Sequence, residues 1–492
     1  MAFTVNQAFN STVEVQNSNQ YQDYIRIFTV GGQGNSSYPS TDLASVALPW
    51  VIGNNLTIGD FSAVCYFFAR DLLEYWNTTN NGKYNSSALP PFGLISNNVG
   101  GTAIELWSST TDLNACYNLS PNNAPYGPPY VNGSLYNGMI LPYSTGPTSI
   151  SGWLFYQSEA NAPPYQHAPE WYSCLFPKLI TNWRTNVFST SSLPSPSSTS
   201  QSTDMPFLFV QIAPFNGTDG WEDIRQAQLS GYFNLQNVGF GTMVDDGDTG
   251  SPYGTYHPRN KQLIGQRLAN TALDIVYNTP TTWLGPMIDT VSFSTSSDGT
   301  TAIAKASFLP NTIPTNGLKY VSQTCPLTIP TSICSDFSIF FKPTPTPTYS
   351  YLGAGFLAAG DDCGNGMMMV NEAYVNCTAN PVCVGFTFNS NTSNPSTPVN
   401  ILFKKSLNYF ASAGWQAYGS DRDVRGVRIP ATGVINTQDN TVTLQATIPD
   451  KSMYIAAASY GWSTWPLTPL YSNDEWDLPM IPWYVENSTA TV

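Results

Sequence analysis

The sequence predicts an α/β domain with a mainly parallel sheet, followed by a β domain that carries an inserted module. Residues 24–285 alternate short apolar runs with longer segments whose apolar residues repeat at helical spacing. Such uninterrupted apolar strands are typical of a parallel sheet that helices cover on both faces. After Pro286 the helical spacing stops, and β-type runs flank a hairpin signal at Asp298-Gly299.

Five apolar runs are the expected strands of the α/β domain: Tyr24–Val30, Phe92–Ser96, Gly152–Tyr156, Phe207–Ile212 and Val238–Val244. The expected helices are a first one in which Val64, Phe67, Phe68 and Leu72 share a face, then Pro169–Phe188, Trp221–Leu229 and one that opens near Arg259. The low-complexity residues 189–203 are expected to form a surface loop.

Changes in composition divide the chain into three parts. Residues 1–285 are the α/β domain, residues 286–342 and 429–492 form the β domain, and residues 343–428 are the insert. A Pro-Thr repeat at residues 343–348 is a stiff linker at the start of the insert.

The overall composition argues against a nucleic-acid partner and against a membrane-spanning helix. Of the 492 residues, 41% are hydrophobic, and only 10% are charged against about 25% in ordinary soluble domains. The net charge of −14 argues against a nucleic-acid partner, because phosphate binding needs clustered Lys and Arg. No apolar run approaches the ~18 residues of a transmembrane helix, so we expect no membrane span.

Several features indicate the secretory route. The chain has eight cysteines, little lysine and eleven Asn-x-Ser/Thr sequons, at Asn10, Asn35, Asn55, Asn77, Asn85, Asn118, Asn132, Asn216, Asn376, Asn391 and Asn487. We therefore expect a secreted protein or one of the lysosomal or endomembrane lumen. The first residues lack the basic start and apolar core of a signal peptide, which suggests that residues precede Met1.

Polar stretches follow the expected strands, where ligands bind in α/β folds. Gly100 and Gly101 allow a tight turn whose backbone N–H groups suit an oxyanion hole, although a plain strand-to-helix turn would look the same. In the next stretch, Gln157 could contribute an amide, with Glu159 and Asn161 bracing the loop; a solvated loop is the alternative.

Two further stretches carry charged groups. Arg225, in a helix that begins at residues 220–223, could face the site, although a structural role is favoured. His257, one of two histidines, follows Asp245 and Asp248, and an imidazole near a carboxylate is the base-and-orienter half of an acyl-transfer triad. A structural histidine stays open, and a metal site is disfavoured because no Cys or second His lies nearby.

These residues resemble the sialate O-acetylesterase family, whose catalytic domain is a flavodoxin-like, three-layer SGNH-hydrolase fold. The resemblance covers about residues 1–285 and returns at Tyr460–Pro466. It is carried by AVCYFFARDL at 63–72, GLISNNVGGTAIELWSS at 93–109, YQSEAN at 156–161, WEDIRQAQ at 221–228 and SPYGTYHPRNKQ at 251–262.

The resemblance implies hydrolysis of O-acetyl esters on sialic acids by a Ser–His–Asp system that needs no cofactor. His257 matches the family histidine, Gly100 the glycine turn and Gln157 the glutamine of the second block. Asp245 and Asp248 match an Asp-x-Gly-Asp pattern, and we rank Asp248 first as the partner of His257. Val99 and Ser158 depart from the Trp and Gly that the family usually has.

The resemblance also predicts that the nucleophile is absent from this chain. The family nucleophile lies in Gly-Gln-Ser-Asn-Met, and Met1 aligns with the Met of that motif. The serine, and the first strand of the fold, would then precede Met1, and residues 1–492 alone would be inactive and poorly stable. Residues 32–37 look like this motif but have Gly34 where the serine is needed, so we interpret them as a surface loop.

Part of the insert, residues 363–418, resembles a PAN/apple-type module, which implies binding of a carbohydrate or a protein; a decoration without a ligand is equally open. Disulfides are expected for Cys325–Cys334 and Cys377–Cys383, because each pair closes a short loop. Cys116 and Cys174 resemble family cysteines, but their partners stay unassigned.

Two hypotheses about function follow. The first is an esterase whose substrate is an O-acetylated sialic acid or another acetylated glycan. The second is a secreted, non-catalytic glycan-binding protein, and the residues encoded before Met1 would discriminate the two.

Overall fold

The computed structural model describes residues 1–32, 34–79, 91–119, 133–145, 150–162, 169–187, 205–217, 220–343, 349–357, 362–380, 383–404, 409–420, 427–450 and 453–487. The low-complexity stretch at 189–203, most of the Pro-Thr repeat, His167 and the sequons at Asn85 and Asn132 lie outside these residues.

The strands of the α/β domain form two separate sheets of three. One has the order β2-β1-β3, with β1 at Ile25–Val30, β2 at Val46–Ile52 and β3 at Phe92–Ser96; the other has the order β4-β5-β6, with β4 at Trp153–Phe155, β5 at Phe207–Gln211 and β6 at Val238–Thr242. All pairings are parallel except that of β2, which runs antiparallel to β1. The five expected strands are present, and β2 is an additional edge strand that contains Pro49.

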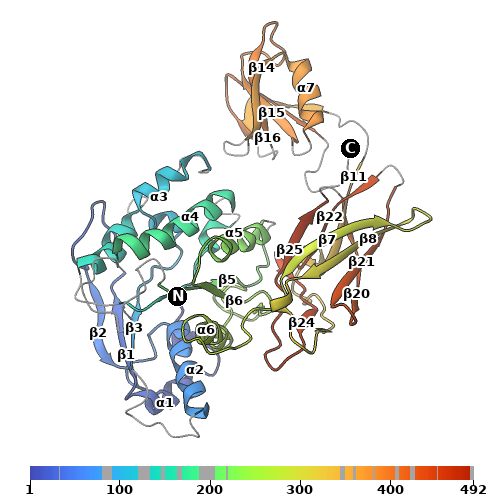
Figure 1. Cartoon of the computed structure of the whole chain (residues 1–492). Coiled ribbons are helices and arrows are strands. Elements are labelled where there is room, and N and C mark those ends of the chain that lie inside the picture. The colour runs from blue at the N-terminus through green and yellow to red at the C-terminus, as the bar shows by residue number, and fades with distance from the viewer. Residues whose placement is uncertain are drawn as a thin grey trace.

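Helices cover both faces of the strands (Figure 1). They are α1 at Ser11–Asn17, α2 at Ala63–Thr79, α3 at Thr110–Ala115, α4 at Pro169–Asn182, α5 at Trp221–Asn234 and α6 at Lys261–Ile275. In β5, Phe207 and Phe209 point into the core that contains α4 and α5, whereas Leu208 and Val210 point into the core that contains α2 and α6. This alternation explains the uninterrupted apolar run of β5.

The C-terminal part is a β domain built mainly from two four-stranded sheets. Their orders are β20-β21-β8-β7 and β19-β11-β22-β25. Residues from both sheets, including Ile339, Leu444 and Ala458, share one apolar core. The strands are β7 at Ile288–Thr295, β8 at Thr301–Phe308, β9 at Leu318–Tyr320, β10 at Cys334–Ser335, β11 at Phe337–Pro343, β19 at Val427–Pro430, β20 at Thr432–Asn436, β21 at Thr441–Thr447, β22 at Met453–Tyr460, β23 at Trp465–Pro466, β24 at Leu470–Ser472 and β25 at Trp483–Glu486.

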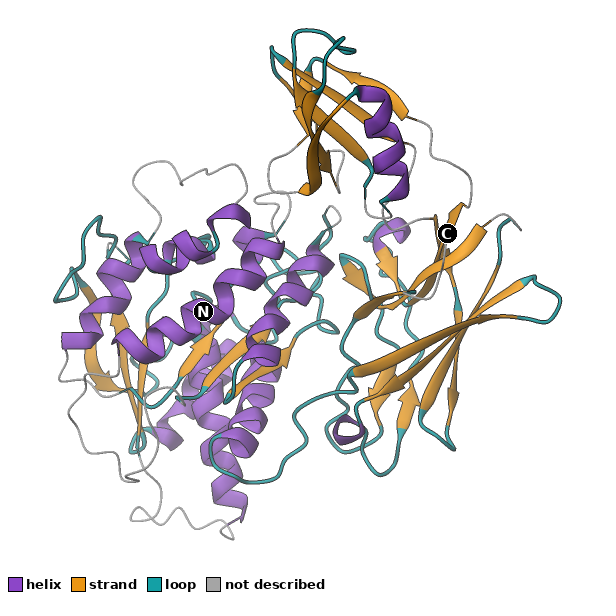
Figure 2. Cartoon of the chain, turned by 45° about the horizontal axis from the view of Figure 1, so that its top comes forward, coloured by secondary structure: helices purple, strands orange, loops and turns teal. Residues whose placement is uncertain are grey.

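The segment between β11 and β19 forms its own antiparallel sheet with the order β12-β18-β15-β16-β14 (Figure 2). Its elements are β12 at Tyr349–Gly353, β13 at Gly355–Leu357, β14 at Asp362–Met368, α7 at Val370–Ala379, β15 at Gly385–Asn389, β16 at Val399–Lys404, β17 at Tyr409–Ala411 and β18 at Trp415–Ser420. Because β11 and β19 pair with each other, the two ends of this segment lie side by side.

Three disulfides join cysteines within the described residues. The expected pairs Cys325–Cys334 and Cys377–Cys383 are confirmed. Cys116 and Cys174, which the sequence left without partners, are joined to each other across 58 residues. Among the helices of the described residues, none combines the length and apolar character that crossing a membrane requires.

Candidate active site

A pocket of about 1120 Å³ lies at the junction of the two sheets of the α/β domain. Residues of β3 line one side and residues of β4 line another, and each is the outermost strand of its sheet among the described residues. Of the residues expected at the site, five reach this pocket: Gly100, Gly101, Gln157, Glu159 and His257. Residues far apart in the sequence therefore share one cavity.

The N-terminal residues lie beside the glycine turn. Met1, Ala2 and Phe3 line the pocket, and the N-terminus lies between β3 and β5 in Figure 1. A Cβ atom placed on Gly100 would lie 3.9 Å from Cβ of Ala2. Gly101 has a φ of +73°, which favours glycine at this position. The expected tight turn is thus present, next to the first residues of the chain.

His257 lies on the loop between β6 and α6, and a backbone carbonyl orients its ring. Its Nδ1 is 2.8 Å from the carbonyl oxygen of Tyr253. Since a carbonyl oxygen only accepts, Nδ1 donates, and Nε2 of the neutral ring keeps a lone pair for a proton. A bond from the Ser251 hydroxyl to the carbonyl of His257 closes the same turn at 2.8 Å.

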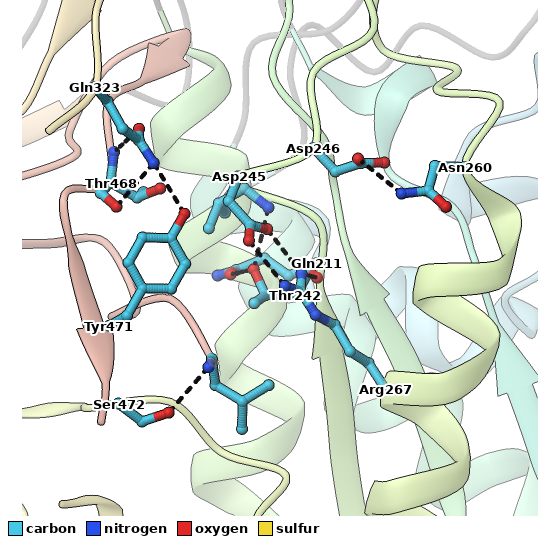
Figure 3. Close-up of polar contacts among 12 residues, drawn as sticks. Gln211, Thr242, Asp245, Asp246, Asn260, Arg267, Gln323, Thr468, Tyr471 and Ser472 are labelled. Atoms are coloured by element: carbon cyan, nitrogen blue, oxygen red, sulfur yellow. Dashed lines mark hydrogen bonds and ion pairs between the residues drawn. The ribbon is translucent and has the colours of Figure 1, made fainter. Parts of the chain in front are cut away.

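The structure does not bring the two expected aspartates to His257. Asp248 is bound by Arg259, with Nε 2.7 Å from Oδ2, and it accepts a further bond from the backbone N–H of Gly250. Asp245 is bound by Arg267 through two bonds, at 2.7 and 2.8 Å (Figure 3). The physical reason is charge: each carboxylate has a guanidinium within reach, which is a stronger partner than a neutral imidazole.

Gln157 is held inside a buried network. Its amide nitrogen donates to the carbonyl oxygen of Thr102 at 3.2 Å and to Oδ1 of Asn161 at 2.7 Å. Asn161 in turn donates to the carboxylate of Glu105 at 2.9 Å, and burial raises the pKa of Glu105. Both amide hydrogens of Gln157 therefore have protein acceptors, and in this structure Gln157 and Asn161 brace the loop.

Arg225, which could have faced the site, does not line the pocket. Its guanidinium is buried and donates to four backbone carbonyls, those of Ile212, Ala213, Ser463 and Thr464, at 2.8–3.0 Å. Burial lowers its pKa to about 9. The structural role that the sequence favoured is the one observed.

Sequence reasoning missed Lys261 as a pocket residue. It is the first residue of α6 and only 1% exposed, with Nζ 4.8 Å from the ring centre of Phe3 and 4.9 Å from that of Tyr156. Burial lowers its pKa to about 8, while Glu159 and Asp246 oppose this shift. Lys261 lies two residues after Arg259, at the start of α6, and no repeat of apolar residues marks this position as buried. Its side chain enters the pocket only because of how α6 packs in the fold.

The pocket also contains a thiol, that of Cys65. Burial raises the pKa of this thiol to about 11, so it stays protonated and is a weak nucleophile at neutral pH. Among the described residues, no three His, Cys, Asp or Glu side chains gather in a way that could hold a metal ion.

Comparison with known proteins shows that the segments around this site are similar to a family of esterases. Residues 68–274 match the model of the family described as carbohydrate esterase, sialic acid-specific acetylesterase. The chain is 30% identical over 336 residues to the sialate O-acetylesterase of Mus musculus, covering 58% of this chain and 57% of the relative. It is 32% identical over 308 residues to the sialate O-acetylesterase of Homo sapiens, covering 58% and 54%.

The chain thus spans somewhat more than half the length of these relatives. A carbohydrate acetylesterase from Xanthomonas citri shares the fold, with a TM-score of 0.59 and 21% identity over 99% of this chain and 78% of that one. Residues 68–274, which include most of the pocket-lining segments and His257, are therefore similar to the family of sialic acid-specific carbohydrate acetylesterases.

Proposed function

We propose that this protein is a carbohydrate esterase that removes O-acetyl groups from sialic acids or related acetylated sugars. The observation that carries the proposal is the convergence in one pocket of His257, oriented through Nδ1, the glycine turn at residues 100–101, and Met1. The family match at residues 68–274 supports the same reaction class.

In the proposed reaction, a serine hydroxyl attacks the acetyl carbonyl carbon while Nε2 of His257 takes the hydroxyl proton. Backbone N–H groups of the turn at Gly100 and Gly101 stabilise the oxyanion, and the imidazolium then protonates the departing sugar oxygen. Water hydrolyses the acetyl-serine, with His257 again as base. Gln157 holds the loop beside this site. If its bond to Thr102 or to Asn161 breaks, its amide can instead donate to the oxyanion.

We place the nucleophilic serine two residues before Met1. In support, Met1 lies inside the pocket, together with Gly100, Gly101 and His257. A residue joined to Met1 would enter the same cavity, close to the glycine turn.

The way the two sheets face each other supports a further strand between β3 and β4. β3 and β4 face the same pocket, and each pairs with only one neighbour within the described part of the chain. A parallel strand between them would satisfy backbone groups on both sides and would end at the site, which is where a nucleophile is placed in α/β folds.

The experiment compares residues 1–492 with a protein extended upstream to include the serine. We expect the extended protein to release acetate from an O-acetylated sialic acid, and residues 1–492 alone to release none. An extended His257→Gln variant is the control for background hydrolysis. Equal acetate release by the two proteins would show that another group is the nucleophile; binding of the sugar without any release would favour the glycan-binding alternative.

Two further assignments extend the proposal. The three disulfides support a secreted or lysosomal, lumenal protein. We assign the insert at residues 343–428 a carbohydrate or protein ligand, on the resemblance of its cysteine-containing segment alone. Binding of the isolated sugar products to the whole protein, with and without the insert's Trp415→Ala substitution, tests a carbohydrate ligand.

A further inference from the structure

We propose that the segment Ser463–Trp465 of the C-terminal β domain is a positioning element for His257. It acts through two contacts with the α/β domain, one at Arg225 and one at Gly247. Neither Arg225 nor Trp465 lines the pocket, so neither is expected to contact the substrate.

The first contact joins the segment to the loop after β5. Arg225 donates to the carbonyl of Ser463 at 2.8 Å and to that of Thr464 at 3.0 Å. The same guanidinium holds the carbonyls of Ile212 and Ala213, both at 3.0 Å. The backbone N–H of Phe215 adds a bond to the carbonyl of Thr464 at 3.0 Å.

An aromatic cluster carries this contact to the histidine. The ring of Phe215 packs against Trp221 at 4.6 Å and against Tyr256 at 5.1 Å. Tyr256 also contacts Trp221 at 5.7 Å, and its ring centre lies 4.2 Å from that of His257. The position of His257 therefore depends on where Phe215 is held.

The second contact holds the start of the His257 loop. A Cβ atom on Gly247 would lie 2.6 Å from two atoms of the Trp465 ring, so that only glycine fits against this indole. The loop is then tied to its far end by a 3.4 Å bond from the N–H of Asp248 to the carbonyl of Thr255. Trp465 thus limits where the loop that ends in His257 can lie.

The test follows the ring of His257 directly and does not depend on catalysis. The chain has two histidines, so ring ¹⁵N spectra of residues 1–492, or of the extended protein, give two sets of signals, and His257→Gln identifies one of them. In the unmodified protein we expect neutral His257 to be mainly the tautomer with a proton on Nδ1, because Nδ1 donates to Tyr253.

We expect Trp465→Leu to shift His257 toward a mixture of tautomers. Phe341→Leu is the matched control. Like Trp465→Leu, it removes part of a buried aromatic ring of the β domain, but at the end of β11 away from the Phe337–Tyr460 pair that precedes the segment. An unchanged tautomer ratio in Trp465→Leu, or an equal change in Phe341→Leu, would overturn the proposal. Trp465→Phe replaces the leucine variant if that variant does not fold.

Gly247→Ala tests the same contact from the other side. Alone, its methyl group should displace the loop and change the His257 signals, whereas in a Trp465→Leu background the methyl group has space and should change them less. Additive effects would contradict a direct contact. A kinetic measurement on an extended protein that releases acetate also tests the contact, and this measurement rests on the proposed function. There, Trp465→Leu should lower kcat by about 10-fold to 100-fold with little change in KM.

Discussion

Arg259 holds both carboxylate oxygens of Asp248, with Nε 2.7 Å from Oδ2 and Nη2 3.0 Å from Oδ1. The acceptor that orients His257 is instead the backbone carbonyl of Tyr253. The carboxylate therefore organises the loop that carries the histidine, and a peptide oxygen takes the place next to the ring.

His257 is the residue whose loss should abolish the proposed reaction. In an extended protein that releases acetate, His257→Ala removes the proton acceptor, and kcat should fall by about 10³-fold to 10⁴-fold, the scale of triad members. Acetate release under saturating substrate measures this, with circular dichroism as the control for folding. A kcat within a few-fold of the unmodified protein would refute the assignment.

Asp248→Asn should make the protein less active and less sensitive to acid. The bonds from Arg259 lower the pKa of Asp248, so its stabilising contribution is present above the unfolded pKa of about 4 and is lost as the pH falls through the lowered value. We expect a loss of kcat smaller than that of His257→Ala and larger than that of Asp245→Asn. Melting temperatures at pH 7 and below pH 4 test the acid dependence, and an unchanged difference between the two proteins would contradict it.

Asp245→Asn should affect stability most. Arg267 and Asp245 are 6% and 10% exposed at their side chains, and removing one partner leaves a buried guanidinium whose charge is unbalanced. We expect a loss of about 3–5 kcal/mol in the free energy of unfolding. Asp439→Asn, which breaks the exposed pair with Lys305, is the matched control and should cost far less. Denaturant unfolding measures both losses. Similar losses would show that burial does not increase the contribution of the Asp245–Arg267 pair to stability.

Lys261→Met should change how stability depends on alkaline pH. Because burial lowers the pKa of Lys261 to about 8, the unfolded chain binds more protons than the folded chain between this value and about 10.4. The free energy of unfolding of the unmodified protein should therefore gain a rising contribution across this interval, of at most about 3 kcal/mol. Lys261→Met should lose that contribution, whereas Lys178→Met serves as control on another helix. Identical pH profiles would show that Lys261 is not held in an unfavourable site.

Ser158→Gly should stabilise the protein. Ser158 has a φ of +139°, a conformation that favours glycine. Relief of this backbone strain should raise the free energy of unfolding by about 1 kcal/mol. Ser173→Gly, inside α4, should instead lower it by about 0.5 kcal/mol. Thermal or denaturant unfolding compares the two, and a destabilised Ser158→Gly would contradict the strain.

The sequence by itself determined where most of the local elements lie and, through them, several of the residues that line the pocket. The run Phe92–Ser96 is β3 with the predicted bounds, because a short apolar run between Pro90-Pro91 and Asn97-Asn98 can be recognised without a distant partner. The pair Cys377–Cys383 was predictable for the same reason, since the two cysteines are six positions apart. The glycine turn, Gln157 and His257 follow strands of two sheets, and all three line one pocket.

Only the tertiary structure decided which groups bind one another. The sequence ranked Asp248 above Asp245 as the partner of His257, but the fold places a guanidinium beside each carboxylate. Arg225 bonds Ser463 across 238 positions of the chain, and the Lys261 ammonium lies over the rings of Phe3 and Tyr156. Hydrogen bonds and ion pairs act over a few ångströms, and the distance between two groups far apart in the sequence is set by how all the intervening elements pack.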